Sequence, residues 1–164
     1  MKFSNPLSET PLVPLVSLLE EMIFVHQELL VLLQREKKWM IAGELEDLLS
    51  GLQQKEAAVV RLRHLEEKRQ DLLDTIGETT LTALIQRTPE PDRSRLVSCQ
   101  TRLQSLTSSI QEINQINGLL VERILDQIAT LTGLLRHLSS ASPVYQSNGR
   151  VIELQASGRK IGKG

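Results

Sequence analysis

The amino-acid sequence predicts an all-α protein: an antiparallel, coiled-coil-like bundle of three long helices plus one short helix, followed by a flexible C-terminal tail. Apolar residues recur at helical spacing through most of the chain, which is typical of helices that bury one face. Only four of the 164 residues are aromatic, so the core is expected to consist of Leu, Ile and Val. A β-sandwich or barrel would use more aromatic side chains and more turn glycines.

The first two long helices are expected at about residues 12–39 and 44–76, with a turn near Gly43 and a C-terminal cap at Gly77. The predicted core-facing residues of the first are Leu12, Leu15, Val16, Leu19, Met22, Ile23, Leu29, Leu30 and Leu33. Those of the second are Leu45, Leu48, Leu52, Val59, Leu62, Leu65, Leu72, Leu73 and Ile76. The predicted connections between successive helices are short, which favours antiparallel packing of neighbouring helices.

A short helix at about residues 80–87 is expected to stop before Pro89 and Pro91, because proline disfavours helix in the residue before it. The last long helix, at about residues 92–140, has a heptad seam. Its positions are Leu96, Cys99, Leu103, Leu106, Ile110, Ile113, Asn117, Leu120, Ile124, Gln127, Leu131, Leu134 and Leu138. Eleven of these thirteen positions are apolar, which predicts left-handed packing against the other helices.

Residues 1–142 are therefore expected to form one helical bundle domain, and residues 143–164 a flexible tail that is basic. The net charge of −1 gives no electrostatic basis for binding nucleic acid. The single cysteine, Cys99, excludes an internal disulfide and suits a reducing cytosol. No uncharged apolar run is long enough to span a bilayer, so no stable membrane insertion is expected.

Candidate catalytic or metal-binding groups are scattered. His26, His64 and His137 stand alone, without a carboxylate or cysteine at metal-ligand spacing, and His26 is better explained as a partly buried structural histidine. These observations predict a binding protein that is not an enzyme and uses no metal or cofactor.

Two polar residues, Asn117 and Gln127, interrupt the seam of the last helix. Each could set the helix register or weaken the packing so that a partner can exchange in. Alternatively, each could form a hydrogen bond to a neighbouring helix.

The end of the same helix carries more apolar residues than a two-position seam needs: Ile124, Ile128, Leu131, Leu134, Leu135 and Leu138. If the other helices stop short of it, this face would be exposed and would suit an amphipathic partner helix. The alternative is that the first helix or the tail covers it.

Several motifs follow one another along the chain. They are Leu29-Leu30-x-Leu32-Leu33-x-x-Glu36, then Leu45-x-x-Leu48-x-x-x-Leu52-x-x-Lys55, then Leu62-x-x-Leu65-Glu66-x-x-Arg69-x-x-Leu72-Leu73 with Gly77, then Ile113-Asn114-x-x-Asn117-Gly118-Leu119-Leu120, and finally Tyr145-x-x-x-Gly149. Because it carries these motifs in this order, the chain resembles the FlgN family of flagellar type III export chaperones. Trp39-Met40 and Glu44 depart from the family's pattern.

The resemblance implies a cytoplasmic chaperone that binds the terminal amphipathic helices of hook–filament junction proteins (hook-associated proteins) and keeps them soluble. It further implies delivery to the cytoplasmic domain of the flagellar export gate, and so transient residence at the membrane-bound export apparatus. Client binding would fall on the face from Ile124 to Leu138, and gate docking on Tyr145. A generic coiled-coil scaffold, or a self-associating structural protein without chaperone activity, is the alternative.

Overall fold

The computed structural model describes residues 12–140, which form four helices: α1 (Leu12–Ala42), α2 (Leu45–Ile76), α3 (Leu81–Arg87) and α4 (Asp92–Ser140). The predicted fold class, three long helices and one short one, is confirmed, and this part of the chain contains no strand. The predicted tail at 143–164 lies outside the described residues. The chain divides into two compact units, Met1–Glu122 and Arg123–Gly164.

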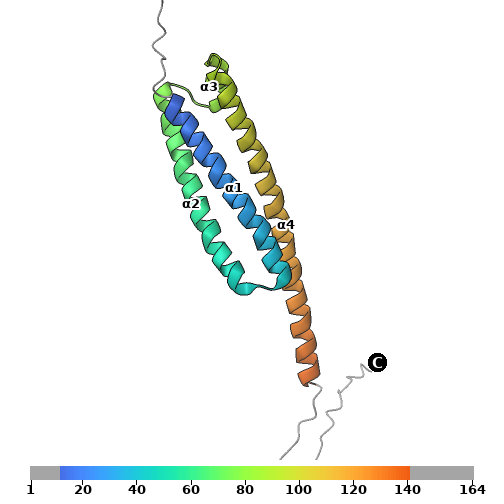
Figure 1. Cartoon of the computed structure of the whole chain (residues 1–164). Helices are drawn as coiled ribbons and strands as arrows, with labels where there is room; N and C mark the ends of the chain where they lie inside the picture. The colour runs from blue at the N-terminus through green and yellow to red at the C-terminus, as the bar shows by residue number, and fades with distance from the viewer. Residues whose placement is uncertain (1–11, 141–164) are drawn as a thin grey trace, which may run out of the picture. The chain divides into compact units, whose positions relative to one another are not determined.

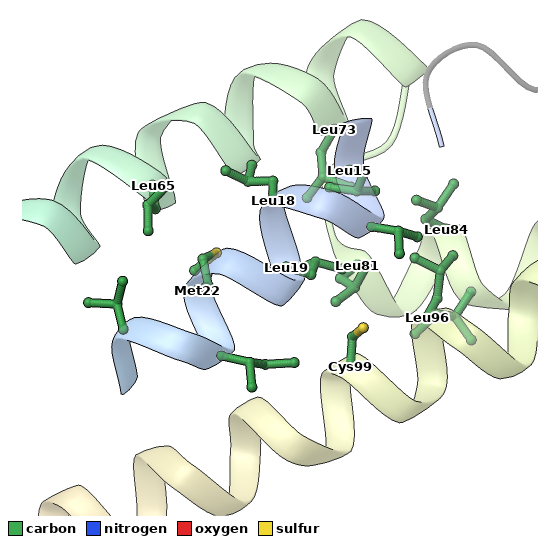
Figure 2. Packing of buried hydrophobic residues seen from close by; sticks show 14 residues of the cluster. Leu15, Leu18, Leu19, Met22, Leu65, Leu73, Leu81, Leu84, Leu96 and Cys99 are labelled. Carbon is green, nitrogen blue, oxygen red and sulfur yellow. The ribbon is translucent and has the colours of Figure 1, made fainter. Parts of the chain in front are cut away.

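Within the first unit, α1 lies between α2 and α4 (Figure 1). Side chains from all four helices meet around α1 (Figure 2), with Leu65 and Leu73 coming from α2 and Leu96 and Cys99 from α4. A second, smaller cluster of buried residues joins α1 to α4 through Leu29, Leu33 and Ile110.

Because α1 has neighbours on two sides, it buries more than the single stripe expected from its sequence. Leu18, Val25 and Leu32 lie outside the predicted stripe and are nevertheless buried. A periodic pattern identifies the most apolar face of a helix, but it does not reveal that a second face is also covered.

The first two long helices each end at a glycine whose backbone is in the left-handed region. Gly43, with φ of 73°, follows α1, and Gly77, with φ of 83°, follows α2. The Gly77 N–H donates to the carbonyl of Asp74 and the Glu78 N–H to that of Leu73, both at 3.0 Å. This pair of bonds is a Schellman motif, as predicted for a C-terminal cap at Gly77.

Side-chain hydrogen bonds mark the starts of α3 and α4. The Thr80 hydroxyl accepts from the backbone N–H of Ala83 at 3.1 Å and caps α3. The Glu90 carboxylate accepts from the backbone N–H of Ser94 at 3.2 Å and from its hydroxyl at 2.6 Å. These bonds favour the ionised carboxylate and lower the pKa of Glu90.

The core face of α2 differs from the predicted one along its first half. Leu45, Leu52 and Val59 were expected to face the core, but all three are exposed. Gly51 is buried there instead, and a Cβ atom on it would lie 2.3 Å from Cζ3 of Trp39. A residue without a side chain lets the indole ring of α1 lie against the backbone of α2, so small residues rather than leucines form this contact.

Candidate partner-binding site

The last part of α4 carries an exposed apolar face, hereafter the α4 face, which consists of Ile124, Ile128, Leu131, Leu134, Leu135 and Leu138. Ile124 is half-buried and each of the other five is at least 54% exposed. Monomeric soluble proteins rarely expose a large contiguous apolar patch, and such patches mark interaction sites when they occur.

The α4 face is continuous because of its spacing. Ile124, Ile128, Leu131, Leu135 and Leu138 follow one another at intervals of four, three, four and three residues, which places them on one side of the helix. Leu134 widens this side. Leu125, which the sequence interpretation did not include, is also exposed, at 59%.

Polar side chains on this part of α4 bind to the helix backbone rather than to the α4 face. The hydroxyl of Thr130 donates to the carbonyl of Asp126 at 2.9 Å, and that of Thr132 to the carbonyl of Ile128 at 2.8 Å. The charged side chains between residues 123 and 139 are Arg123, Asp126 and Arg136. The surface can therefore bind an apolar stripe of a partner with little electrostatic preference.

The two polar seam residues have different surroundings. Gln127 is exposed. Asn117 is only 4% exposed, and its Nδ2 donates to the backbone carbonyl of Leu33 at 3.0 Å and to Oε2 of Glu36 at 2.9 Å. Its Oδ1 has no hydrogen-bond partner.

Asn117 belongs to a polar junction of three helices. Lys55 of α2 donates from Nζ to Oε1 of Glu36 at 2.6 Å, while Asn117 of α4 binds the other oxygen of that carboxylate. The Glu36 side chain is 14% exposed and that of Lys55 27%, so the ion pair is largely shielded from water. A shielded, charge-assisted pair is more sensitive to geometry than a surface ion pair.

Structural contacts also involve His26, the Glu66–Arg69 pair and Cys99. His26 is half-buried, as expected, and its Nδ1 lies 2.7 Å from the carbonyl of Met22. Arg69 donates from Nε to Glu66 at 2.8 Å, and this hydrogen bond is the main cause of a lowered pKa for Glu66 and a raised one for Arg69. Burial raises the pKa of the Cys99 thiol, and the charge of Glu20 adds to this effect.

Of the other predicted features, Tyr145 lies outside the described residues. Within residues 12–140, no three His, Cys, Asp or Glu side chains are placed so that they could hold a metal ion. No helix in that range combines the length and the apolar character needed to cross a bilayer.

Taken together, the fold defines a helical-bundle protein in which side chains from all four helices share one buried core. A family model described as "FlgN protein" matches residues 14–151, which is most of the chain. The chain therefore belongs to the FlgN family, a family of flagellar export chaperones, and the expected resemblance is confirmed. Among curated proteins and among solved structures, no match was found.

Proposed function

We propose that this protein is a cytoplasmic export chaperone that binds the terminal amphipathic helices of hook–filament junction proteins on the α4 face and keeps those helices soluble. The observation that carries the proposal is the exposure of Ile128, Leu131, Leu134, Leu135 and Leu138 on one side of α4. An apolar stripe of this width matches the apolar side of one partner helix. Membership of the FlgN family supplies the flagellar context.

The affinity would come from burying apolar surface. Each square ångström removed from water contributes about 25 cal/mol before the cost of association is subtracted. A client helix whose apolar side is hidden on the chaperone cannot associate with other copies of itself. The same contact therefore explains both recognition and solubility.

Delivery to the export apparatus requires a second contact. We assign it to Tyr145, which the family resemblance associates with the cytoplasmic domain of the export gate. The chaperone would then be cytoplasmic and would reside at the membrane-bound apparatus only while it hands over its client.

The client site is tested by replacing Leu131 and Leu135, which lie one turn apart on the α4 face, with aspartate. The variant is titrated calorimetrically with a purified hook–filament junction protein, and we expect its affinity to fall at least about a hundredfold because two charges would be buried in an apolar contact. The matched control, Ala129→Asp/Gly133→Asp, adds the same charges at the same spacing on the opposite side of the helix. Equal affinity of the two variants for the client would contradict the assignment.

Tyr145→Ala tests the division of roles. We expect it to leave the affinity for the junction protein unchanged and to weaken binding to the isolated cytoplasmic domain of the export gate. Loss of both interactions would show that the two contacts are not separate.

The α4 face also favours a second candidate function, because an exposed seam of this kind can pair with its own copy. In that case the protein would be a coiled-coil scaffold or a self-associating structural protein. Light scattering after size-exclusion chromatography distinguishes the two candidate functions. A free monomer that forms a one-to-one complex with a junction protein supports the chaperone, and a stable homo-oligomer that ignores the junction protein supports the scaffold.

A further inference from the structure

The exposed residues of α4 form an uninterrupted stretch near the end of the helix. Every residue from Leu125 to Arg136 is exposed, whereas Asn117, about two turns before the stretch, is buried. Tertiary packing of an apolar side supplies most of the stability of helices in globular proteins. From Leu125 to Arg136 the helix is therefore stabilised mainly by its own backbone hydrogen bonds.

The residues of this stretch favour helix only weakly. Thr130, Thr132 and Gly133 lie within one turn of each other, and threonine and glycine rank low among helix formers. The hydroxyl groups of both threonines donate to backbone carbonyls one turn earlier, and such bonds slightly destabilise a helix. Asp126 and Arg136 are ten residues apart, too far to form a stabilising ion pair along the helix.

Gly133 has the strongest effect of these residues on the local helix. A Cβ atom added there would meet nothing within 4 Å, so no close contact requires a glycine. In a helix interior, glycine is less favourable than alanine by a factor of about four to five in the helical equilibrium. Leu134, Leu135 and Leu138 come after Gly133, and they belong to the α4 face only while the helix continues past it.

We infer that Gly133 sets the affinity of the α4 face for its client, because it limits the fraction of molecules in which the last turns of α4 are helical before the client binds. The inference rests on the proposed chaperone function and adds a positioning residue to it. Gly133 lies on the side of the helix opposite the α4 face, so it acts without touching the client. When only a fraction of the molecules can bind, the apparent dissociation constant rises by the inverse of that fraction.

Such a device suits a protein that must give up its client. An apolar contact wide enough for recognition also tends to hold the client tightly. If part of the binding free energy is used to order the helix, the same contact area gives a lower affinity. The α4 face can then remain wide while the client is still released at the export apparatus.

The test is Gly133→Ala in the full chain, with Gly118→Ala as the matched control. A Cβ atom meets nothing within 4 Å at either position, but Gly118 follows the buried Asn117, where packing already stabilises the helix. Amide hydrogen exchange of the free protein, followed by NMR, measures the helical population. Calorimetric titration with a purified hook–filament junction protein measures the affinity.

We expect Gly133→Ala to slow the exchange of the amides of residues 134–136 about two- to fivefold and to tighten client binding by a similar factor. Gly118→Ala should change neither quantity. Ala129→Gly, also opposite the α4 face, should act in the reverse direction, with faster exchange and binding about two- to fivefold weaker.

Tighter binding by Gly133→Ala without slower exchange would overturn the inference, because the added methyl group would then act by contact. So would exchange at residues 134–136 of the unaltered protein as slow as at residues 113–117, since the helix would already be complete. Protection that rises with protein concentration would also overturn it, because a second copy would then order the helix. If no variant binds the junction protein, the proposed function fails, whereas a bound client whose affinity is unchanged by Gly133→Ala defeats this inference alone.

Discussion

The side-chain amide of Asn117 in α4 donates a 2.9 Å hydrogen bond to the carboxylate of Glu36 in α1. The other oxygen of the same carboxylate accepts a bond from Lys55 in α2, so three helices meet at one polar point inside an aliphatic seam. Leucines can pack in several alignments, but this junction forms in only one of them. The junction therefore favours one register of α4 against α1.

Asn117→Asp tests this junction, because it places a second carboxylate against Glu36 with almost no change in shape. We expect the free energy of unfolding at pH 7 to fall by about 3 kcal/mol, as for other unpaired buried charges. Part of this loss should be recovered as the pH is lowered, since repulsion and burial favour the neutral acid. Urea denaturation at two pH values measures both effects.

The control is Asn114→Asp, the same chemical change one turn earlier at an exposed position of α4. It should alter stability by less than about 0.5 kcal/mol. If the two substitutions cost the same, Asn117 has no special structural role.

Gly51→Ala is expected to destabilise the bundle although alanine is the better helix former. Its Cβ would lie 2.3 Å from the Trp39 ring, so the indole must move or the helices must separate. Forcing extra volume into a packed contact costs about 1–3 kcal/mol, which exceeds the gain in helix propensity of roughly 1 kcal/mol.

Gly118→Ala is the matched substitution, since a Cβ there meets nothing within 4 Å. It should raise the midpoint of thermal unfolding, while Gly51→Ala lowers it. Stabilisation by both would show that Trp39 yields easily and that the close approach of α1 and α2 does not depend on Gly51.

The sequence was sufficient for the fold class and for the seam of α4, because one heptad pattern there continues from Leu96 to Leu120 and each of these seam positions is buried or half-buried. It failed on the first half of α2, where Leu45 and Leu52 suggested the wrong core face. Periodicity shows that a side of a helix is apolar, but it does not show which of two apolar sides faces the core. The small side chains of Gly51 and Ala58 were the available signal, because small residues permit close helix contact.

The candidate site was less accessible to sequence reasoning. The pattern identified the apolar residues from Ile124 to Leu138, but the exposure of each side chain is a property of the tertiary structure that periodicity does not give. The link from Glu36 to Lys55 and Asn117 joins residues far apart in the chain, and no local motif predicts it.

The thiol of Cys99 should react slowly with a soluble disulfide reagent in the native protein. It is buried, and burial raises its pKa, so both access and the thiolate fraction are low. We expect the reaction to be at least about a hundredfold slower than in denaturant, and to accelerate as the pH rises. Because Cys99 is the sole cysteine, absorbance reports this site directly. If the thiol reacted nearly as fast in the native protein as in denaturant, this would contradict the packing of α4 onto α1 around Cys99.

Buried and exposed leucines of this chain should contribute very differently to its stability. Leu33 of α1 is fully buried in the cluster that joins α1 to α4, and Leu33→Ala should lower the free energy of unfolding by about 3 kcal/mol, because it leaves a cavity among well-packed neighbours. Leu131 and Leu135 are 60% and 66% exposed, so replacing both with aspartate should change stability by no more than about 1 kcal/mol. Urea denaturation followed by circular dichroism gives both free-energy changes. A loss for the α4 pair as large as that for Leu33→Ala would mean that these leucines pack within the protein itself, and the α4 face would then not be free to bind a client helix.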